Sequence, residues 1–252
     1  MSRLVARDPW FRLRDLTAAR IAIGRAGGSL PTRELLSFSL DHARARDAVH
    51  HPLDVNALRA GLAERGLPCM TVHSAAGDRA TYLRRPDLGR RLDDASRARL
   101  RDAADGRGYD LALVFADGLS AVAVERHALS VIDGLLAALG DWRLAPVVIA
   151  EQARVALGDD IGSALRARQV VMLIGERPGL SSPDSLGLYL THAPRPGLSD
   201  ADRNCISNVR PAGLVPAAAA RRLDHLLRGA RALGASGVAL KDDFSEIGRA
   251  LD

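Results

Sequence analysis

The sequence predicts an α/β fold: a Rossmann-like, mostly parallel sheet with helices on both faces, preceded by a helical N-terminal region. Apolar runs typical of buried strands lie at 110–116, 146–150 and 169–174. Segments with helical periodicity separate these runs, and this alternation favours parallel pairing. The chain has 252 residues, 47% of them hydrophobic. It can therefore bury a sizeable core without disulfides or metals.

The first 66 residues predict three helices. The first spans 9–25, opens at Pro9 and stops at the glycines that follow it. The second begins at Ser29-Leu30-Pro31-Thr32 and breaks at Pro52, and its second half is charged on every side, which is typical of a solvated or partner-facing helix. The third spans 54–65, with Asp54 as its N-cap. We therefore expect a helical N-terminal region at 1–66 and a Rossmann-like domain at 67–252.

The remaining elements follow from alternation, periodicity and turn residues. Cys69–His73 and Ala80–Leu83 predict a short hairpin, Leu186–His192 a strand, and 237–240 another short strand. Helices are expected at 92–105, from Ser120 to Leu139, at 159–168 and at Pro216–Leu233.

Composition and motifs exclude several functional classes. No apolar stretch approaches the ~20 residues that a membrane span needs, and the N-terminus has no secretory leader pattern, so we expect a cytosolic protein. Cys69 and Cys205 lie far apart and no histidines have metal-ligand spacing, which argues against disulfide scaffolds and metal sites. The net charge of +5 comes from arginines scattered among acids, with Lys241 as the only lysine. This pattern does not favour nucleic-acid binding.

A ligand site is predicted at one edge of the sheet. Three strands in succession end in the loops Asp117-Gly118, Glu151–Val155 and Gly175–Gly179, and ligands of such sheets bind at the carboxyl ends of the strands. The segment 175–211 adds two loops rich in Pro and Gly, with Cys205 in what reads as a polar loop. The same residues also fit a plainer interpretation, in which Glu176 and Arg177 form a solvent-facing ion pair and Cys205 is a small apolar group.

Recognisable catalytic motifs are missing. The chain has no G-x-G-x-x-G between a strand and a helix, no Walker A loop and no G-x-S-x-G elbow. No nucleophile, base and orienting group assemble by spacing, so independent hydrolytic catalysis is not expected. The residues alone indicate an α/β ligand-binding domain with a charged helical face.

Several long and unusual stretches resemble a known family. In chain order they are DLTAARIAIGRAGG, LDHARARDAV, TYLRRPDLGRRL, FADGLSA, IGERPGLSSPDSLGLYLTHAPRPG and DRNCISNVRPAGL. From about Asp15 to Asp242 the chain resembles the small (light) subunit of ethanolamine ammonia-lyase.

The resemblance implies an adenosylcobalamin-dependent radical rearrangement of ethanolamine to acetaldehyde and ammonia. In this family the large subunit is a TIM barrel that holds the substrate, and the small subunit closes over the cobalamin. The resemblance thus implies a hetero-oligomer in which residues 1–66 contact the large subunit and this chain alone is inactive. A cytoplasmic location, either free or inside a bacterial microcompartment, is also implied.

Family cobalamin contacts correspond to Val155, Glu176 and Cys205, with Asp117 and Ser120 as further neighbours. No catalytic residue and no metal ligand is implied in this chain. Cobalamin enzymes that replace the cofactor's own base carry D-x-H-x-x-G, whereas Asp224 and His225 are adjacent here. We therefore expect base-on cobalamin, with dimethylbenzimidazole still bound to cobalt.

Two alternatives remain open. The chain could be a non-catalytic cobalamin-binding or scaffold protein of the same fold that has lost its partner. A nucleotide-binding regulator is a weaker alternative, because the phosphate-binding loop is missing.

Overall fold

A single six-stranded sheet organises the chain in the computed structural model, which describes residues 5–244. The strand order is β1-β3-β2-β4-β5-β6. The first four strands in this order are parallel, and β5 and β6 are antiparallel to their neighbours. The bounds are β1 (Cys69–His73), β2 (Tyr109–Ala116), β3 (Val147–Glu151), β4 (Ala167–Gly175), β5 (Leu186–His192) and β6 (Arg203–Val209). The predicted α/β class with a mostly parallel sheet is confirmed.

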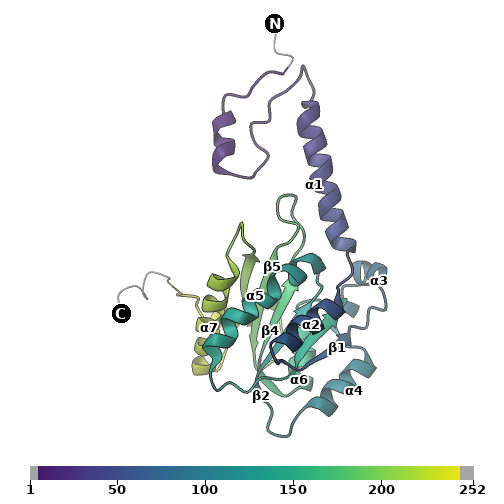
Figure 1. Cartoon of the computed structure of the whole chain (residues 1–252), viewed down its shortest axis with the longest axis vertical. Coiled ribbons are helices and arrows are strands. Elements are labelled where there is room, and N and C mark those ends of the chain that lie inside the picture. Colours follow the sequence, from purple (N-terminus) through teal and green to yellow (C-terminus); the bar gives the residue numbers. More distant parts are fainter. Residues whose placement is uncertain (1–4, 245–252) are drawn as a thin grey trace.

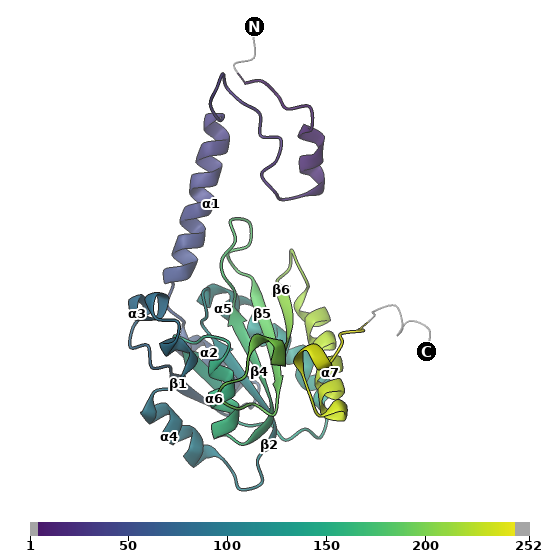
Figure 2. The same cartoon turned by 180° about the vertical axis from the view of Figure 1, so that it is seen from behind.

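Helices cover both faces of the sheet (Figures 1 and 2). Their bounds are α1 (Thr32–His50), α2 (Val55–Glu64), α3 (Arg79–Arg84), α4 (Asp94–Ala103), α5 (Ala121–Leu139), α6 (Leu157–Ala164) and α7 (Pro216–Leu233). Alternate residues of β2 enter two separate apolar clusters: Leu111 and Leu113 meet α2, α5 and α7, whereas Ala112 and Val114 meet α4 and α6. This is the packing expected for a strand that is buried on both faces.

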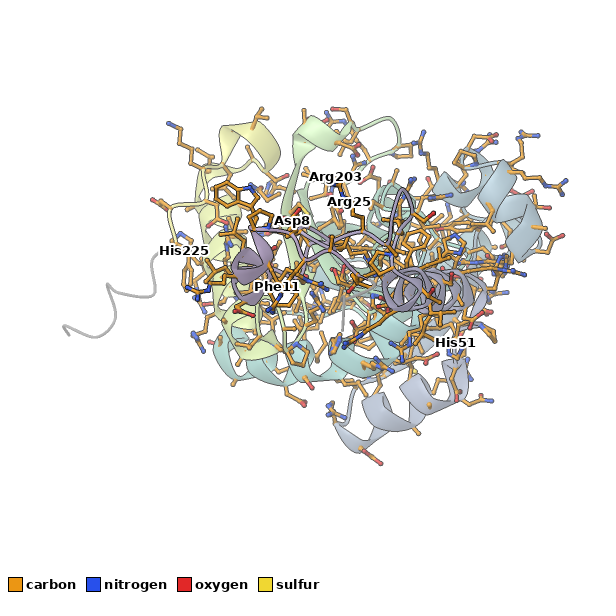
Figure 3. The ribbon with its side chains drawn as sticks, turned by 90° about the horizontal axis from the view of Figure 1, so that it is seen from above. Asp8, Phe11, Arg25, His51, Arg203 and His225 are labelled. Atoms are coloured by element: carbon orange, nitrogen blue, oxygen red, sulfur yellow. The ribbon has the colours of Figure 1, made fainter. Side chains whose placement is uncertain are left out.

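The part of the chain before α2 stands away from the sheet. Helix α1 rises from the same end of the sheet as the loop between β4 and β5, and the segment before it lies alongside (Figures 1 and 2). Ala48 is the only buried residue of α1. Two ion pairs join the preceding segment to α1: Arg14 with Glu34 at 3.1 Å and Arg20 with Asp41 at 2.5 Å. Seen from above, Asp8, Phe11 and Arg25 lie over this end of the molecule (Figure 3).

Three of the predicted helices and strands are wrong. The expected helix at 9–25 is only a 3-10 helix, Phe11–Leu16, because no residue of this stretch is buried and Ala22 and Gly24 adopt positive φ. The expected hairpin is absent, because Asp78 caps α3 by accepting from the Thr81 amide at 2.7 Å, and β1 pairs instead with β3. The expected strand at 237–240 is a 3-10 helix that starts at Gly237 with φ +73°.

The other predicted helices and strands are present. β5 and α7 have the predicted bounds, Leu186–His192 and Pro216–Leu233. Helix α2 contributes Leu58 and Leu62 to the main core. Within residues 5–244, no helix is both long and apolar enough to cross a membrane.

A buried ion pair fixes the antiparallel edge of the sheet to a helix. Arg203 on β6 pairs with Asp159 on α6, and the two side chains are only 2% and 3% exposed. Arg203 also contacts Asp200 at 3.1 Å, but the Asp200 side chain is fully exposed. Burial raises the pKa of Asp159 to about 6, although the positive charge of Arg203 opposes this shift.

Removing the cation from this pair should destabilise the fold. We expect Arg203→Met to lower the free energy of unfolding by about 3–5 kcal/mol near pH 8, because Asp159 then remains buried without a partner. The folded-state pKa of Asp159 lies above its ordinary value, so protonation favours the folded state and the loss should be smaller near pH 5.5. Urea unfolding at pH 8 and at pH 5.5 measures the loss of stability at each pH. Asp200→Ala is the control and should change stability by less than about 1 kcal/mol; a loss in Arg203→Met no larger than this would contradict the assignment.

Candidate functional site

The carboxyl ends of three adjacent parallel strands form the candidate site. Strands β3, β2 and β4 are neighbours in the sheet. The loops that follow them begin at Gln152, Asp117 and Glu176 and therefore meet at one edge. The prediction that these loops converge is confirmed.

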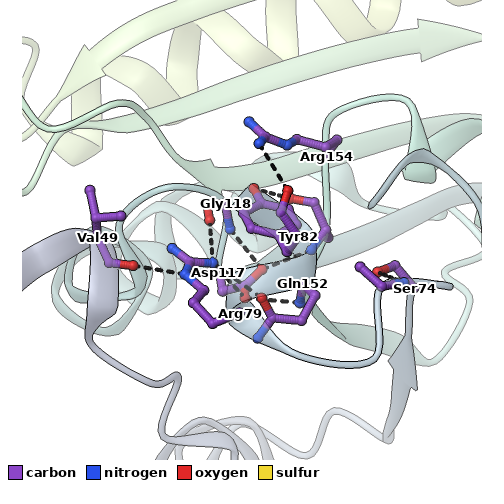
Figure 4. A network of polar contacts seen from close by, with 10 residues as sticks. Val49, Ser74, Arg79, Tyr82, Asp117, Gly118, Gln152 and Arg154 are labelled. Carbon is purple, nitrogen blue, oxygen red and sulfur yellow. Dashed lines mark hydrogen bonds and ion pairs between the residues drawn. The ribbon is translucent and has the colours of Figure 1, made fainter. Parts of the chain in front are cut away.

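Asp117 holds two of the loops together (Figure 4). Its carboxylate accepts hydrogen bonds from the backbone N–H groups of Gly118 at 2.8 Å, Gln152 at 2.9 Å and Ala153 at 2.9 Å. The residue is only 4% exposed. Gln152 has a positive φ of 53°, which is unfavourable for a residue other than glycine. Asp117 thus stabilises a strained turn after β3 and fixes it to the end of β2.

Arg79 extends this network to α1. Its Nη1 donates to the Gly118 carbonyl at 2.9 Å and contacts the Asp117 carboxylate at 3.3 Å, and its Nε donates to the Val49 carbonyl at 2.7 Å. Burial raises the pKa of Asp117, whereas the Ala153 amide, the Arg79 charge and the other two amides favour the ionised form. One arginine therefore connects the end of α1 to the loops of the site.

The Tyr82 ring lies between two guanidinium groups. Arg79 is 4.7 Å and Arg154 is 4.2 Å from the ring centroid. The Tyr82 hydroxyl donates to the Ala153 carbonyl at 3.0 Å. These contacts fix the loop that carries Val155.

The loop after β4 approaches the loop after β2 very closely. The Leu119 amide donates to the Gly175 carbonyl at 2.9 Å. A Cβ atom on Gly118 would lie 2.2 Å from the Gly175 oxygen, and one on Gly175 would lie 1.9 Å from the Ser120 oxygen. Both positions therefore require glycine. The Ser120 hydroxyl donates to the Pro183 carbonyl at 2.7 Å and so anchors the β4–β5 loop.

A cavity of about 400 Å³ opens where these loops meet. Val155 and Glu176 both line it, as do Arg154 and Tyr189. The structure thus brings two of the three predicted contact residues to one cavity.

Glu176 keeps one carboxylate oxygen available. Its Oε2 accepts from the Ser185 hydroxyl at 2.5 Å and from the Asn208 amide at 3.2 Å. Its Oε1 forms no hydrogen bond within residues 5–244, and the side chain is half-buried. The predicted plain alternative, an ion pair with Arg177, is absent from the described part of the chain. The carboxylate is held in place with one acceptor free for a ligand.

Cys205 does not lie in a polar loop, so this prediction is wrong. It lies in β6, directly opposite Tyr189 of β5, and is exposed. The strand is not recognisable from sequence because most of its residues are polar, so apolar and polar residues do not alternate clearly along it. Cys205 does not line the cavity, but it lies opposite Tyr189 across the two strands, and Tyr189 does line the cavity. Burial and the adjacent Cys205 raise the pKa of Tyr189, so its hydroxyl remains protonated.

Asp117 and Ser120, expected as further neighbours of a ligand, are directed into the protein. They are 4% and 0% exposed, and their side chains bind backbone groups of adjacent loops. The sequence did not indicate Arg79 or Tyr189. Arg79 lies in the wrongly predicted hairpin, and the pairing of Tyr189 with Cys205 depends on the unpredicted strand β6.

Among the residues of the site, Asp117 should cause the largest loss of stability when it is substituted. We expect Asp117→Ala to lower the free energy of unfolding by about 3–5 kcal/mol, because it removes the acceptor of three amides and the partner of Arg79. Asp117→Asn, which retains one acceptor oxygen, should lose less. Asp133→Ala removes an exposed partner of Arg65 and is the control, with an expected loss below about 1 kcal/mol. Equal losses in Asp117→Ala and Asp133→Ala, measured by urea unfolding, would contradict the role assigned to Asp117.

Comparison with known proteins identifies the family. Residues 7–241 match the family model described as "Ethanolamine ammonia-lyase light chain (EutC)". The chain is 59% identical over 246 residues to the ethanolamine ammonia-lyase small subunit of Azotobacter vinelandii, covering 96% of this chain and 91% of the relative. It is 58% identical over 242 residues to that of Ralstonia nicotianae, covering 94% of this chain and 90% of the relative. The chain therefore belongs to the ethanolamine ammonia-lyase light-chain family.

Proposed function

We propose that this chain, as the small subunit of an ethanolamine ammonia-lyase, forms one wall of an adenosylcobalamin site. The complex would convert ethanolamine to acetaldehyde and ammonia, with the substrate held by a TIM-barrel large subunit. The observation that carries the proposal is the common cavity of Val155 and Glu176, next to the Tyr189–Cys205 pair.

The chemistry of the cavity fits the periphery of a corrinoid. That periphery carries neutral amide side chains, and the free Oε1 of Glu176 can accept a hydrogen bond from one of them. Val155, Leu119 and Ile174 supply apolar contacts. A cavity of about 400 Å³ suits a small ligand. A corrinoid is much larger, so only part of its edge would enter, and a second protein surface must cover the rest.

The residues of this chain would bind and orient the cofactor. Bound adenosylcobalamin would supply the radical chemistry, and protein groups determine its placement. Glu176 would fix one amide, Val155 would exclude water from the ring edge, and Tyr189 would keep Cys205 in position beside the cavity. We also propose base-on binding, since His225 lies within α7 and pairs with Asp243 at 2.8 Å instead of belonging to a D-x-H-x-x-G loop.

The large subunit would dock on the same end of the molecule. Helix α1 exposes large apolar side chains there: Leu35, Leu36, Phe38 and Leu40 are 50%, 64%, 41% and 52% exposed. Several large apolar side chains exposed on one helix favour a protein interface. Helix α1 rises from the end of the sheet where the β4–β5 loop lies (Figure 1). A partner on α1 could therefore close the candidate cavity, which Glu176 of this loop lines. In this arrangement neither subunit completes the site alone, so this chain would be inactive by itself, whether the complex is free in the cytoplasm or enclosed in a microcompartment.

Reconstitution tests the proposed function directly. The large subunit and adenosylcobalamin are combined with or without this chain, and ammonia release from ethanolamine is measured. Release that requires this chain supports the enzyme role. Release that does not depend on this chain would favour the alternative of a cobalamin-binding or scaffold protein.

Glu176 should affect cofactor affinity more than turnover. In the reconstituted complex we expect Glu176→Gln to raise the KM for adenosylcobalamin roughly tenfold, with kcat changed less than about twofold, because one charge-assisted hydrogen bond is weakened. Glu64→Gln makes the same chemical change on an exposed residue at the end of α2 and is the control. A KM for Glu176→Gln equal to that of the control would count against contact between Glu176 and the cofactor.

The apolar surface of α1 should determine assembly. We expect Leu36→Asp combined with Leu40→Asp to weaken association with the large subunit by more than about tenfold, since two apolar contacts are replaced by desolvated charges. Leu233→Asp, on α7, is the control because Leu233 is similarly exposed, at 54%. Light scattering coupled to size-exclusion chromatography reports the complex. Unchanged assembly of the α1 variant would place the interface elsewhere.

A further inference from the structure

A second cleft, of about 560 Å³, lies at the opposite end of the sheet from the candidate cofactor site. It is formed at the start of β4 and the end of β5, between the last turns of α6 and α7. The residues that define its chemistry are Trp142, Arg166, Arg168, Gln169, His192 and Arg231.

Two residues that line this cleft carry buried polar atoms without protein partners among residues 5–244. Gln169 is 1% exposed; its Nε2 donates to the Leu227 carbonyl at 3.2 Å, but its Oε1 has no hydrogen-bond partner. His192 is the cross-strand partner of Gln169, and its buried Nδ1 is also without a partner. Buried polar atoms in native proteins are nearly always hydrogen-bonded to protein, water or a ligand, so a water or a bound ligand is expected to satisfy them. The Gln169 oxygen can only accept, so that molecule must bring a donor.

The rim of the cleft is cationic. Arg168 lies 3.9 Å from Asp110, and Arg231 stacks over the Trp142 ring at 5.0 Å. The Arg166 guanidinium has no ion pair within residues 5–244. Burial and the Arg168 charge lower the pKa of His192, so its ring is neutral near pH 7. Three arginines and one carboxylate thus line the cleft, and this excess of positive charge attracts an anionic group.

The two helices that end at the cleft favour a donor at its inner side. Ser163 lies in the last turn of α6, and Gly234 is the C-cap of α7. The carbonyl groups at helix C-termini carry partial negative charge and attract ammonium or hydroxyl donors. An anion alone would satisfy the arginines but neither these carbonyls nor Gln169.

We propose that the cleft binds a small zwitterion, in which a phosphate or carboxylate is joined by a short chain to an ammonium group. The anionic group pairs with Arg166 and Arg168, and the ammonium group donates to the Gln169 Oε1. This site does not depend on the proposed cofactor function, because it shares no residue with the cobalamin cavity.

Calorimetric titration of the full chain tests the proposal. The zwitterionic probes are O-phosphoethanolamine and β-alanine, and the half-probes are inorganic phosphate, acetate and ethylamine. We expect at least one zwitterion to bind at least about tenfold more tightly than each of its halves. Whichever of the two zwitterions binds more tightly shows whether the site prefers phosphate or carboxylate as the anionic group.

Variants then locate the binding. Arg166→Gln combined with Arg168→Gln should weaken binding of the tighter-binding zwitterion about tenfold or more. Gln169→Met should reduce the ratio between the affinity for this zwitterion and the affinity for phosphate or acetate, whichever is its anionic half. Arg107→Gln is the control, since Arg107 is exposed and lies outside the cleft. The arginine variants change exposed side chains, so they remain informative if Gln169→Met does not fold. Zwitterions that bind no better than their halves, or arginine variants that bind like Arg107→Gln, would overturn the proposal.

Discussion

The hydrogen bonds of the buried Asp117 carboxylate determine the geometry of the candidate cofactor site. This one side chain connects the end of β2 to the turn after β3 through three backbone amides, and it compensates for the strained conformation of Gln152. A buried carboxylate is costly unless its hydrogen bonds are complete. The network therefore tolerates few alternative loop conformations and presents Val155 at a defined position.

Arg79 extends the Asp117 hydrogen-bond network to α1. Arg79 contacts the Asp117 carboxylate and also donates to the Val49 carbonyl. It therefore connects the loops of the site to the C-terminal end of α1. The exposed apolar face of α1 and the cavity with Glu176 consequently belong to one end of the molecule. This arrangement suits a subunit whose binding surface is completed by a neighbour. A site of this kind also explains why the polar residues that would bind and orient a ligand are concentrated in the loops, while the sheet is almost entirely apolar.

Much of the central sheet could be predicted because its strands are buried on both faces and read as continuous apolar runs. The loops after β2, β3 and β4 followed from that order, and so did the positions of Val155 and Glu176. Strand β6 could not be predicted in the same way, because an edge strand with exposed polar residues resembles a loop. The segment at 9–25 has helical spacing but no surface to pack against, and isolated short helices are marginal. Arg79 and Tyr189 act through partners distant in sequence, so no local pattern identifies them.

Hydrogen–deuterium exchange of the assembled complex, with and without adenosylcobalamin, tests the central claim most directly. If this chain forms a wall of the cofactor site, backbone amides at 153–157, 175–179 and 203–207 should exchange more slowly when the cofactor is bound. Amides at 166–169, around the second cleft, should be unaffected. Equal exchange at the three site segments with and without the cofactor would contradict the account.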